Sequence, residues 1–566
     1  MLQGPTRSFA TARLLTQIAL LCGLASALGQ SCTDDLGLQD TSFACDSSAP
    51  CADGWECVNS VCVLVPVIPQ TAVNLEILPT SEEIPPWTPA TGCQQFTICS
   101  RQDPVPGEPW QGCAMVDFDA VADGQQLEYL APAGKKVQLS VSCAPTGGGE
   151  SSAPMWSARS CPRLATEDEP LTLKIRLLPA SAFSAAHDSQ GHKIAMETPR
   201  AFHSCSTLSD GSVLVAGGFG SEGHSLASAE LLSLDSGRFE TLPQEYQMTS
   251  ARAHAASVIL PDGRLAIFGG LDAAGEPVVS VDLFNPETQS FTAGPPMDFT
   301  RAGHTATLLG STGEVVLAGG EGQGGGGWAI WQPSSGVTKS GTLHEPRYFH
   351  TAAPVPASSA DSTEHVLFAG GEWLEGETTL VRATSELLSI PGMSTSLLGL
   401  CTGQGVESVG RTRHVGVSLP QSDLSTLVGG AECFGPDCGL SRVCLWSSSL
   451  LEWIEGPDAL SYPPRRSWPT ASPVEHASHR GLLFSGGRPT AAGAPEPNKS
   501  YYMATVPTQH GGSTISMDKL NHTQLQPRWG HGAVTLCDGR VMLTGGLTGD
   551  IDNGEPTDSV EVFNPW

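Results

Sequence analysis

Hydrophobic and polar positions follow one recurring order through the second part of the chain. A polar start leads into a short apolar stretch, a turn and a second apolar stretch that stops at paired glycines, as in RWGHGAVTLCDGRVMLTGG at 528–546. An Asp-Gly turn between two apolar stretches is a strong signal for a β-hairpin. Each copy of this order therefore predicts two antiparallel strands.

The order occurs seven times. Close copies lie at 200–218, 252–270 and 301–320, and looser copies end at later glycine pairs. Successive pairs are 50 to 59 residues apart, and their first glycines are Gly217, Gly269, Gly319, Gly370, Gly429, Gly486 and Gly545. A period of this length in a strand-rich sequence indicates a repeat architecture.

Each repeat continues with further strand-like segments. A third follows the glycine pair, as in AELLSL (229–234) and VEVFNP (560–565), and most repeats add a fourth, such as SFTAG (290–294). Four antiparallel strands per repeat, set around an axis, form the blades of a β-propeller. The paired glycines allow the backbone to turn, or to approach a neighbour, where a Cβ would obstruct it.

This succession of an apolar strand, Gly-Gly, an apolar third strand and an aromatic in the fourth resembles the kelch motif, and the seven copies cover about 185–566. The resemblance implies an all-β fold with a seven-bladed kelch-type β-propeller of the galactose oxidase/kelch superfamily at 186–566. Propellers of this family often close by pairing the beginning of the domain with its end.

Closure of the propeller needs a strand from outside the last repeat, which stops after its third strand. Met196 and Arg200 have the spacing of Met248 and Arg252, where a fourth strand passes into the next repeat. We therefore expect residues 190–197 to pair with the C-terminal blade. Without such a strand the last blade would keep an open edge.

Two smaller parts precede the repeats. Residues 67–185 contain alternating or continuously apolar segments at 73–78, 112–121, 135–143 and 171–179, which predict a β-sandwich-like domain tied by disulfides. Residues 30–66 form a cysteine-rich module with too few apolar residues to fold without disulfides. Its CADGWECVNSVCV segment resembles modules of exported bacterial proteins, notably myxobacterial ones, and its spacings do not favour zinc.

The first 29 residues have the features of a secretory signal peptide. Arg7 and Arg13 precede an apolar run at 14–28, and small residues at 25–29 offer a cleavage site. We expect an exported protein that is extracellular, at the cell surface or periplasmic, without a transmembrane segment. Lipid anchoring at Cys32 is the weaker alternative, because the residues before it match a lipobox poorly.

Composition argues against two classes of partner. The 566 residues include 64 glycines and 43 prolines, and Asp and Glu outnumber Lys and Arg by 58 to 29, for a net charge of −29. Nucleic acid needs a basic surface, so it is not an expected partner, and neither is an anionic membrane. We expect a monomer whose partner is an unidentified protein or carbohydrate.

The cysteines agree with export to an oxidising compartment. Of the 17, Cys22 lies in the signal peptide, ten lie between 32 and 161, and six lie between 205 and 537. The even numbers suggest pairing within each region, although connectivity cannot be read from the sequence. A pair between Cys205 and Cys537 is doubtful because they stand at different depths, whereas Cys401 could pair with Cys444.

Six repeats begin with an arginine and a histidine, and a strand pair that returns to its origin puts these starts on one propeller face. Either they form a basic mouth for an anionic or sugar ligand, or they hold loops and neighbouring blades together, and we favour the structural role. The tentative ring is Arg200, His203, Arg252, His254, Arg301, His304, Arg347, His350, Arg411, His414, Arg528 and His531.

Copper chemistry is the first enzymatic alternative, because galactose oxidase, a copper radical oxidase, shares the propeller. Its site needs two tyrosines, two histidines and a crosslinked cysteine, including a Tyr-His pair. None of the six tyrosines here directly precedes a histidine; Tyr348 and His350 come nearest, with the wrong spacing. We therefore expect no copper, no other cofactor or metal, and no catalytic residues.

The sequence predicts a secreted or cell-surface, non-catalytic binding module for a protein or glycan. The loops after the glycine pairs vary in length, which is typical of a recognition surface. Two alternatives stay open: an enzyme with a site at the channel mouth, either copper radical oxidase-like or glycan-active, and a purely structural surface protein. An acidic loop at 549–556 is interpreted as solvated, because its spacing misses that of a calcium-binding loop.

Overall fold

The protein is described here from a computed structural model. The described residues are 55–58, 61–64, 70–78, 95–104, 110–117, 127–143, 156–166, 170–188, 190–233, 236–355, 363–390, 392–401, 410–418, 424–428, 430–431, 443–454, 466–476, 479–489, 499–507, 513–549 and 554–565. The signal peptide, Cys32, Cys433, Cys438 and residues 550–553 of the acidic loop lie outside them. No described helix is long and apolar enough to cross a membrane.

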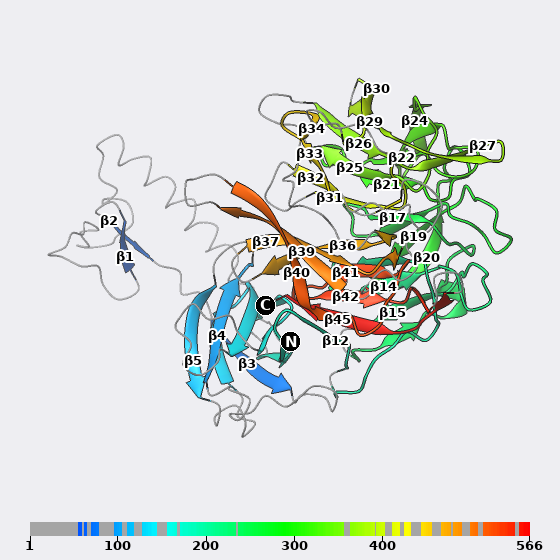
Figure 1. Cartoon of the computed structure of the whole chain (residues 1–566). Helices are drawn as coiled ribbons and strands as arrows, with labels where there is room; N and C mark the ends of the chain where they lie inside the picture. The colour runs from blue at the N-terminus through cyan, green and yellow to red at the C-terminus, as the bar shows by residue number, and fades with distance from the viewer. Residues whose placement is uncertain are drawn as a thin grey trace, which may run out of the picture. The chain divides into compact units, whose positions relative to one another are not determined.

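Seven four-stranded antiparallel sheets among the described residues form the blades of a propeller (Figure 1). Their innermost strands touch one another in a closed cycle, β13, β17, β21, β25, β31, β36, β41 and back to β13. The predicted all-β, seven-bladed fold is therefore confirmed.

The strands of the first four blades follow one another along the chain, apart from an inserted hairpin in blade 4. They are β13 (Ser204–Thr207), β14 (Val213–Ala216), β15 (Ala229–Leu232) and β16 (Phe239–Thr241); β17 (Ala256–Ile259), β18 (Leu265–Phe268), β19 (Val281–Asn285) and β20 (Ser290–Gly294); β21 (Thr305–Leu308), β22 (Val315–Ala318), β23 (Gly327–Gln332) and β24 (Gly336–Thr342); β25 (Thr351–Val355), β26 (Glu364–Ala369), β29 (Thr384–Ile390) and β30 (Ser394–Gly399).

The last three blades follow the same plan, but blade 7 takes its outer strand from far upstream. They are β31 (Val415–Ser418), β32 (Leu424–Val428), β33 (Cys444–Ser447) and β34 (Glu452–Ile454); β36 (Thr470–His476), β37 (His479–Ser485), β39 (Lys499–Pro507) and β40 (Ser513–Thr523); β41 (Gly532–Thr535), β42 (Val541–Thr544), β45 (Val560–Asn564) and β12 (Ala182–Ala185).

One backbone hydrogen bond repeats at all seven junctions between blades. The N–H of the second glycine of each pair donates to the carbonyl of the arginine that begins the next blade, over 2.7 to 2.9 Å. The donors and acceptors are Gly218 and Arg252, Gly270 and Arg301, Gly320 and Arg347, Gly371 and Arg411, Gly430 and Arg466, Gly487 and Arg528, and Gly546 and Arg200. The last of these bonds closes the circle.

The first glycine of the pair is required by the same approach. At Gly319, φ is +63° and an added Cβ would collide with the Arg347 carbonyl oxygen and with the His350 ring of blade 4. The same collision with the next arginine carbonyl recurs at the other described first glycines. Glycine is thus needed for a left-handed conformation and for close contact between two backbones.

The segment that completes blade 7 differs from the expected 190–197. The paired strand is β12, whose residues 182–185 run antiparallel to 561–564 of β45 (Figure 1). Within 190–197, pairing with blade 7 is limited to the bridge between Ala195 and Ser559 and a bond from the Met196 N–H to the Asp558 carbonyl.

The predicted segment differs from the observed strand because the methionine lies in the connector between blades and not in a strand. Met248 and Met297 make the bonds equivalent to that of Met196, and both lie beyond the strands β16 and β20 that precede them. All three methionines are buried. The shared spacing therefore located the passage into the next blade correctly, while the strand itself lies further upstream.

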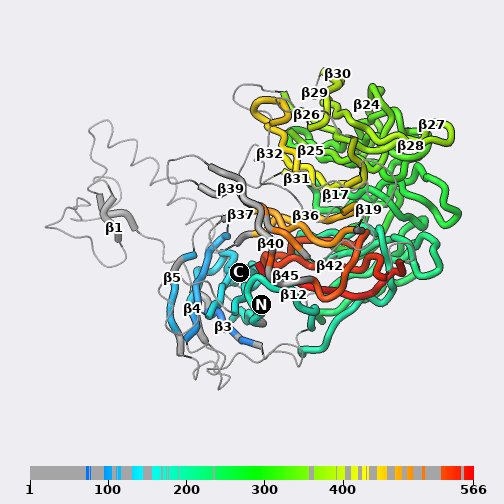
Figure 2. The backbone as a smooth tube through the Cα atoms, in the orientation of Figure 1, coloured from blue at the N-terminus to red at the C-terminus, as the bar shows by residue number. Residues whose placement is uncertain are grey.

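The β-sandwich-like domain has two sheets that share one core. The first is β10 (Leu171–Arg176), β3 (Gln70–Leu78) and β6 (Leu127–Pro132); the second is β11 (Leu178–Pro179), β8 (Trp156–Arg159), β7 (Lys136–Cys143), β4 (Gln95–Gln102) and β5 (Gln111–Asp117), with β9 (Arg163–Leu164) beside β7. Buried Val73 and Leu173 from the first sheet pack with Phe96 and Val141 from the second. Figure 2 shows the backbone of the two sheets in blue to cyan.

Three disulfides have both cysteines among the described residues. Cys99–Cys113 joins β4 to β5, and Cys401–Cys444 joins blades 4 and 5, as the sequence suggested. Cys161–Cys537 links the two regions that the cysteine counts had separated, which corrects the expectation of pairing within each region. It leaves Cys205 as a free thiol.

The cysteine-rich module is a separate unit of the chain. Within it β1 (Trp55–Val58) pairs with β2 (Val61–Leu64) in a hairpin that places Cys57 opposite Cys62. The rest of the module lies outside the described residues.

We predict that Gly319→Ala destabilises the propeller far more than Gly376→Ala. Both glycines have φ +63°, so each variant loses about 1 to 2 kcal/mol in the left-handed region. Only at Gly319 does the new methyl meet another backbone, which adds about 2 kcal/mol or more, whereas nothing lies within 4 Å of the one at Gly376. Urea unfolding midpoints measure the difference; equal shifts would contradict the role given to the glycine pair.

Candidate functional site

The arginines of the predicted ring point into the protein. All seven repeat arginines are at most 2% exposed, including Arg466, which the ring had omitted. Six of them donate from Nη1 to the carbonyl of the first glycine in their own blade, over 2.7 to 2.9 Å; they are Arg200, Arg252, Arg301, Arg347, Arg466 and Arg528. The candidate binding surface therefore lies away from these side chains, because they are buried and six of them donate within their own blade.

Buried acids in the third strands neutralise four of the arginines. Arg200 pairs with Glu230 at 2.6 Å and Arg347 with Glu386 at 2.8 Å. The other two pairs are Arg252–Asp282 and Arg528–Glu561. Each acid also accepts from backbone N–H groups of the connector before its arginine, as Glu230 does from 197 and 198. The acid thus fixes the connector and the arginine together.

Blades 3 and 5 use other partners. Arg301 lies 3.2 Å from Asp298 of its own connector, since Ala329 occupies the strand position that carries the acid elsewhere. Arg411 approaches the sulfur of Cys444 at 3.6 Å. Burial lowers the pKa of Arg200, Arg252 and Arg347, and the paired carboxylates oppose that shift.

Five ring histidines fill the junctions between blades. Each is the third residue after a repeat arginine, and four share a hydrogen bond from Nε2 with a threonine hydroxyl of the preceding blade, over 2.9 to 3.1 Å. The pairs are His203 with Thr544, His350 with Thr305, His414 with Thr351, and His531 with Thr470. These contacts are structural and hold neighbouring blades in register.

The fifth junction histidine, His304, has no such partner. It is 6% exposed, and neither ring nitrogen has a hydrogen-bond partner in the described part of the chain. The position that carries a threonine in blades 3, 4 and 6 is Ala256 in blade 2. A buried polar group without a partner is costly, so this junction is the least well satisfied of the five.

His254 belongs to a different set. It stands two residues after Arg252, where every blade places one residue at a positive φ between +51° and +62°. We call this set the axial ring: Phe202, His254, Gly303, Phe349, Arg413, Trp468 and Gly530. Six members of the axial ring donate a backbone N–H to the carbonyl of the member in the preceding blade. The series starts with the bond from Phe202 to Gly530 and ends with the bond from Trp468 to Arg413.

The side chains of the axial ring meet at the propeller axis. Phe202 and His254 have ring centroids 4.5 Å apart, and Phe349 lies 4.8 Å from Trp468. The two phenylalanine rings occupy the space where Cβ atoms of Gly530 and Gly303 would stand. The axial ring therefore holds five side chains and two glycines, Gly303 and Gly530. The five side chains pack together at the propeller axis.

Three residues that directly follow glycine pairs, Phe219, Glu321 and Glu372, lie around this cluster. Tyr348 pairs with Glu372 through a β-bridge, and Trp373 follows Glu372 in the chain. We define the mouth as Phe219, Glu321, Tyr348, Glu372 and Trp373, together with Arg413 of the axial ring. Phe219 lies 5.5 Å from His254, and Tyr348 lies 6.2 Å from Trp373. The mouth is thus assembled from blades 1, 3, 4 and 5.

Charges at the mouth are only partly balanced. Arg413 donates to buried Glu372 with Nη2 at 2.9 Å from Oε1, and Thr412 donates to the same carboxylate at 2.7 Å. Burial raises the pKa of Glu321, and nearby Glu372 and Glu276 raise it further. Burial and the carboxylates of Glu372 and Glu321 raise the pKa of Tyr348 to about 12.

An inserted hairpin extends the mouth outward. It consists of β27 (Glu372–Glu375) and β28 (Thr378–Val381) and follows directly after Gly371 of blade 4 (Figure 2). Leu374 on this hairpin is 52% exposed. Trp373 packs over the glycine-rich loop of blade 3, where an added Cβ at Gly325 would strike its ring.

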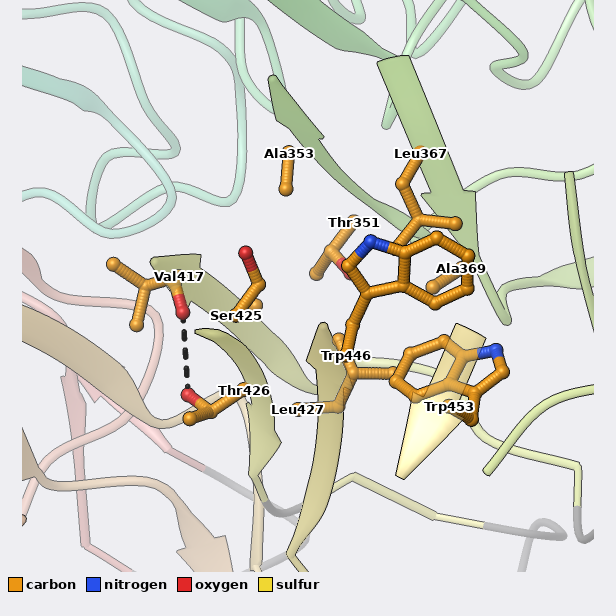
Figure 3. Close-up of a pocket in the computed structure, with 11 residues that line it drawn as sticks. Thr351, Ala353, Leu367, Ala369, Val417, Ser425, Thr426, Leu427, Trp446 and Trp453 are labelled. Carbon is orange, nitrogen blue, oxygen red and sulfur yellow. Dashed lines mark hydrogen bonds between the residues drawn. The ribbon is translucent and has the colours of Figure 1, made fainter. Parts of the chain in front are cut away.

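A small hollow lies between blades 4 and 5, where Trp446 and Trp453 meet Thr351 and Leu427 (Figure 3). Its volume of about 10 Å³ has room for roughly one water molecule. It is part of the packing between blades and is too small for an organic ligand.

Comparisons with known proteins give little beyond this geometry. No family model and no curated protein matches the chain. Among solved structures, it is similar to a fungal alcohol oxidase of the AA5 family in complex with copper, at 14% identity and a TM-score of 0.48, over 66% of this chain and 75% of that one. A likeness of this size assigns neither copper nor oxidase activity here.

Tyr348 and His350, the residues nearest to a copper-oxidase pattern, have different roles in the structure. Tyr348 lies at the mouth, whereas His350 is buried at the junction with blade 3 and bonds to Thr305. No group of three or more metal-ligating His, Cys, Asp or Glu side chains occurs within the described ranges.

Sequence reasoning missed the acids of the third strands and the residues of the mouth. The acids had a readable signal, because Glu230, Asp282, Glu386 and Glu561 each stand at the same position of a third strand. The only signal for the mouth was the position after each glycine pair, because the residue type there differs between blades, as Phe219, Leu271 and Glu321 show.

We predict that Ala256→Thr stabilises the protein and that Ala256→Val does not. Threonine and valine have the same shape, but only threonine offers a hydroxyl to His304 of blade 3. A buried hydrogen bond contributes about 1 kcal/mol. The difference between the urea midpoints of the two variants measures it, and a threonine variant no more stable than the valine variant would reject the proposed equivalence of the junctions.

Acid should destabilise the propeller through the junction histidines. Burial, with nearby arginines, lowers the pKa of His203 and His304 to about 3, and those of His350, His414 and His531 also fall well below 6.5. These imidazoles stay neutral in the folded protein but take up protons on unfolding below about pH 6.5, so the stability present above that pH is lost as the pH falls.

The measurement is the melting temperature between pH 7 and pH 4.5. Each histidine adds at most about 1.4 kcal/mol per pH unit to the slope. His304→Gln should flatten the curve, whereas His224→Gln, at an exposed position, should leave it unchanged. Equal slopes for the two variants would show that His304 does not contribute.

Proposed function

We propose that this chain is an exported or cell-surface binding module that holds a protein or glycan ligand at the mouth of its propeller. The observation that carries the proposal is the division of roles within each repeat. The repeat arginine and the junction histidine are buried and hold the blades together. The residue after each glycine pair differs in type between blades, and several of these residues lie near the propeller axis.

Three properties of the mouth support a binding role. Tyr348, Trp373 and Phe219 offer half-exposed aromatic faces, and aromatic side chains are enriched where proteins bind ligands. The axial ring beside them is rigid, because its members are tied by backbone hydrogen bonds. The hairpin of blade 4 adds an exposed apolar tip at Leu374. Loops on a rigid scaffold are the usual carriers of recognition.

Export is part of the proposal. The disulfides Cys99–Cys113, Cys161–Cys537 and Cys401–Cys444 fit a protein that matures in an oxidising compartment. The signal-peptide features of the first residues point the same way.

One observation favours a glycan-active enzyme as the second candidate. Glu321 and Glu372 stand at equivalent positions of adjacent blades, and their environments differ. Arg413 and Thr412 donate to Glu372, whereas burial and neighbouring carboxylates raise the pKa of Glu321. Glycoside hydrolysis uses two carboxyl groups, and the one that acts as general acid needs a raised pKa.

The binding proposal predicts that mouth variants lose ligand. The purified, oxidised protein is screened on arrays of glycans and surface proteins, and the affinity of any hit is measured. Trp373→Ala and Leu374→Asp should each weaken binding about tenfold or more, because central apolar contacts dominate recognition. Leu397→Asp is the matched control, since Leu397 is 44% exposed on the outer strand β30 of the same blade.

Release of new reducing ends from a bound glycan, abolished by Glu321→Gln, would replace the binding proposal by the enzymatic one. Absence of any ligand on the arrays, with no turnover, would overturn both and favour a structural surface protein.

A further inference from the structure

Blade 7 is the one blade among the described residues whose sheet combines distant parts of the chain. β12 joins β45 near the C-terminus, whereas the other six sheets are each built from one continuous stretch. The β-sandwich-like domain, which we call the β domain, meets the propeller at this blade, and four separate contacts tie the two together.

The first contact is the chain itself. β11 of the β domain pairs with β8, through Leu178 opposite Ser157, and ends at Pro179. β12 begins at Ala182, only a short link later. The closing strand of the propeller therefore follows directly from an edge strand of the β domain, with only residues 180 and 181 between them.

The second contact comes from the other strand of the closure. Asn564, the last residue of β45, is fully buried, and its Nδ2 lies 3.1 Å from the carbonyl oxygens of Ser157 and Leu178 and 3.2 Å from that of Pro179. One side-chain amide thus fastens the C-terminal strand to β8 and β11. Both strands that seal the ring are anchored in the same part of the β domain.

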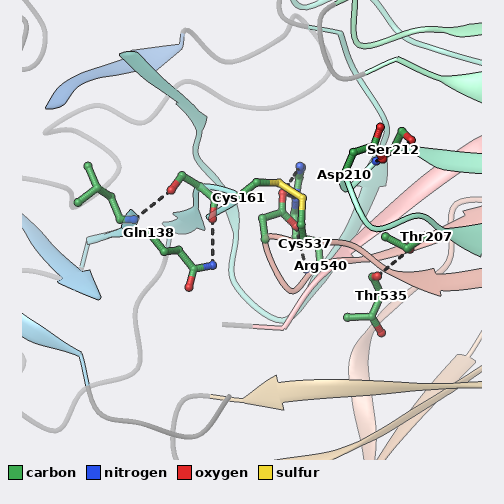
Figure 4. Close-up of a disulfide and its surroundings, with 11 residues drawn as sticks. Gln138, Cys161, Thr207, Asp210, Ser212, Thr535, Cys537 and Arg540 are labelled. Atoms are coloured by element: carbon green, nitrogen blue, oxygen red, sulfur yellow. Dashed lines mark hydrogen bonds and ion pairs between the residues drawn. A yellow bond between two sulfur atoms is a disulfide. The ribbon is translucent and has the colours of Figure 1, made fainter. Parts of the chain in front are cut away.

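The third contact is covalent. Cys161, which follows β8, forms a disulfide with Cys537 in the turn between β41 and β42 (Figure 4). The bond spans 376 residues of sequence, and it attaches the inner half of blade 7 to the domain that already holds the outer half. Beside it, the Thr207 hydroxyl of blade 1 donates to the Thr535 carbonyl of blade 7.

The fourth contact is a shared apolar core. Buried Trp156 and Leu178 of the β domain belong to one cluster with Val562 of blade 7 and with Val213 and Phe239 of blade 1. Beyond β12, buried Asp188 accepts two hydrogen bonds from Arg238 of blade 1, at 2.7 and 2.9 Å. The β domain therefore covers the junction where the first and last blades meet.

We propose that the β domain is a clasp for the propeller: it anchors both strands of the closure, and blade 7 is where the ring opens once the clasp is released. Closure by β12 alone depends on four residue pairs of one short strand. The clasp converts that short pairing into a junction held by backbone, amide, disulfide and core contacts.

The test compares local opening of the blades in the full, oxidised chain by hydrogen–deuterium exchange. Cys161→Ser with Cys537→Ser should raise exchange in β12, β41, β42 and β45 about tenfold or more and leave blade 3 unchanged, because opening is local and not global. The control is Cys401→Ser with Cys444→Ser, which removes a disulfide of the same ring and should affect blades 4 and 5 only.

Two outcomes would overturn the proposal: exchange in blade 7 that stays at the level of the unmodified protein, or exchange that rises equally in all blades. Asn564→Ala, which keeps both disulfides, should also raise exchange in β12 and β45. If the double cysteine variant does not fold, the exchange of blade 7 relative to blade 3 in Asn564→Ala tests the proposal.

Discussion

The propeller depends on one short contact between backbones, repeated at every junction. The second glycine N–H of a blade donates to the carbonyl of the arginine that begins the next blade, and the first glycine leaves the space that this approach needs. Because Gly546 makes the same bond to Arg200, the contact runs through all seven junctions and returns to its start. The arginine side chain then turns back into its own blade, where it ties the glycine carbonyl to the third strand.

This arrangement separates the residues that build the ring from those that are free to recognise something. In four blades the repeat arginine pairs with a third-strand acid of its own blade, so buried charge is paired where it would otherwise be costly. Four of the junction histidines bond to a threonine of the preceding blade. The axial ring has fixed backbone conformations but accepts phenylalanine, tryptophan, histidine, arginine or glycine. The positions after the glycine pairs also vary, and Phe219, Glu321 and Glu372 among them contribute to the mouth. The binding role that we propose for the mouth rests on this variation.

The β domain gains a role from its place at the weakest point of the circle. Six blades are continuous in sequence and close on themselves locally, whereas blade 7 must bring together residues that are far apart in the chain. Bringing together residues so far apart in the chain costs more conformational entropy on folding than closing a short hairpin does. The disulfide at Cys161 and the amide of Asn564 act at that junction, which explains why cysteines from two regions of the sequence pair with each other.

The sequence by itself determined the repeat, the number of blades, most strands and the need for a closing strand, because hairpin turns, apolar stretches and glycine pairs are local signals. It also suggested the pairing of Cys401 with Cys444. Only the tertiary structure decided that 182–185 close the ring, that the arginines and junction histidines are internal, and that Tyr348, Glu372 and Arg413 come together at the mouth. These outcomes depend on contacts between residues of different blades, and no local pattern of residue types encodes which distant side chain will satisfy a buried charge.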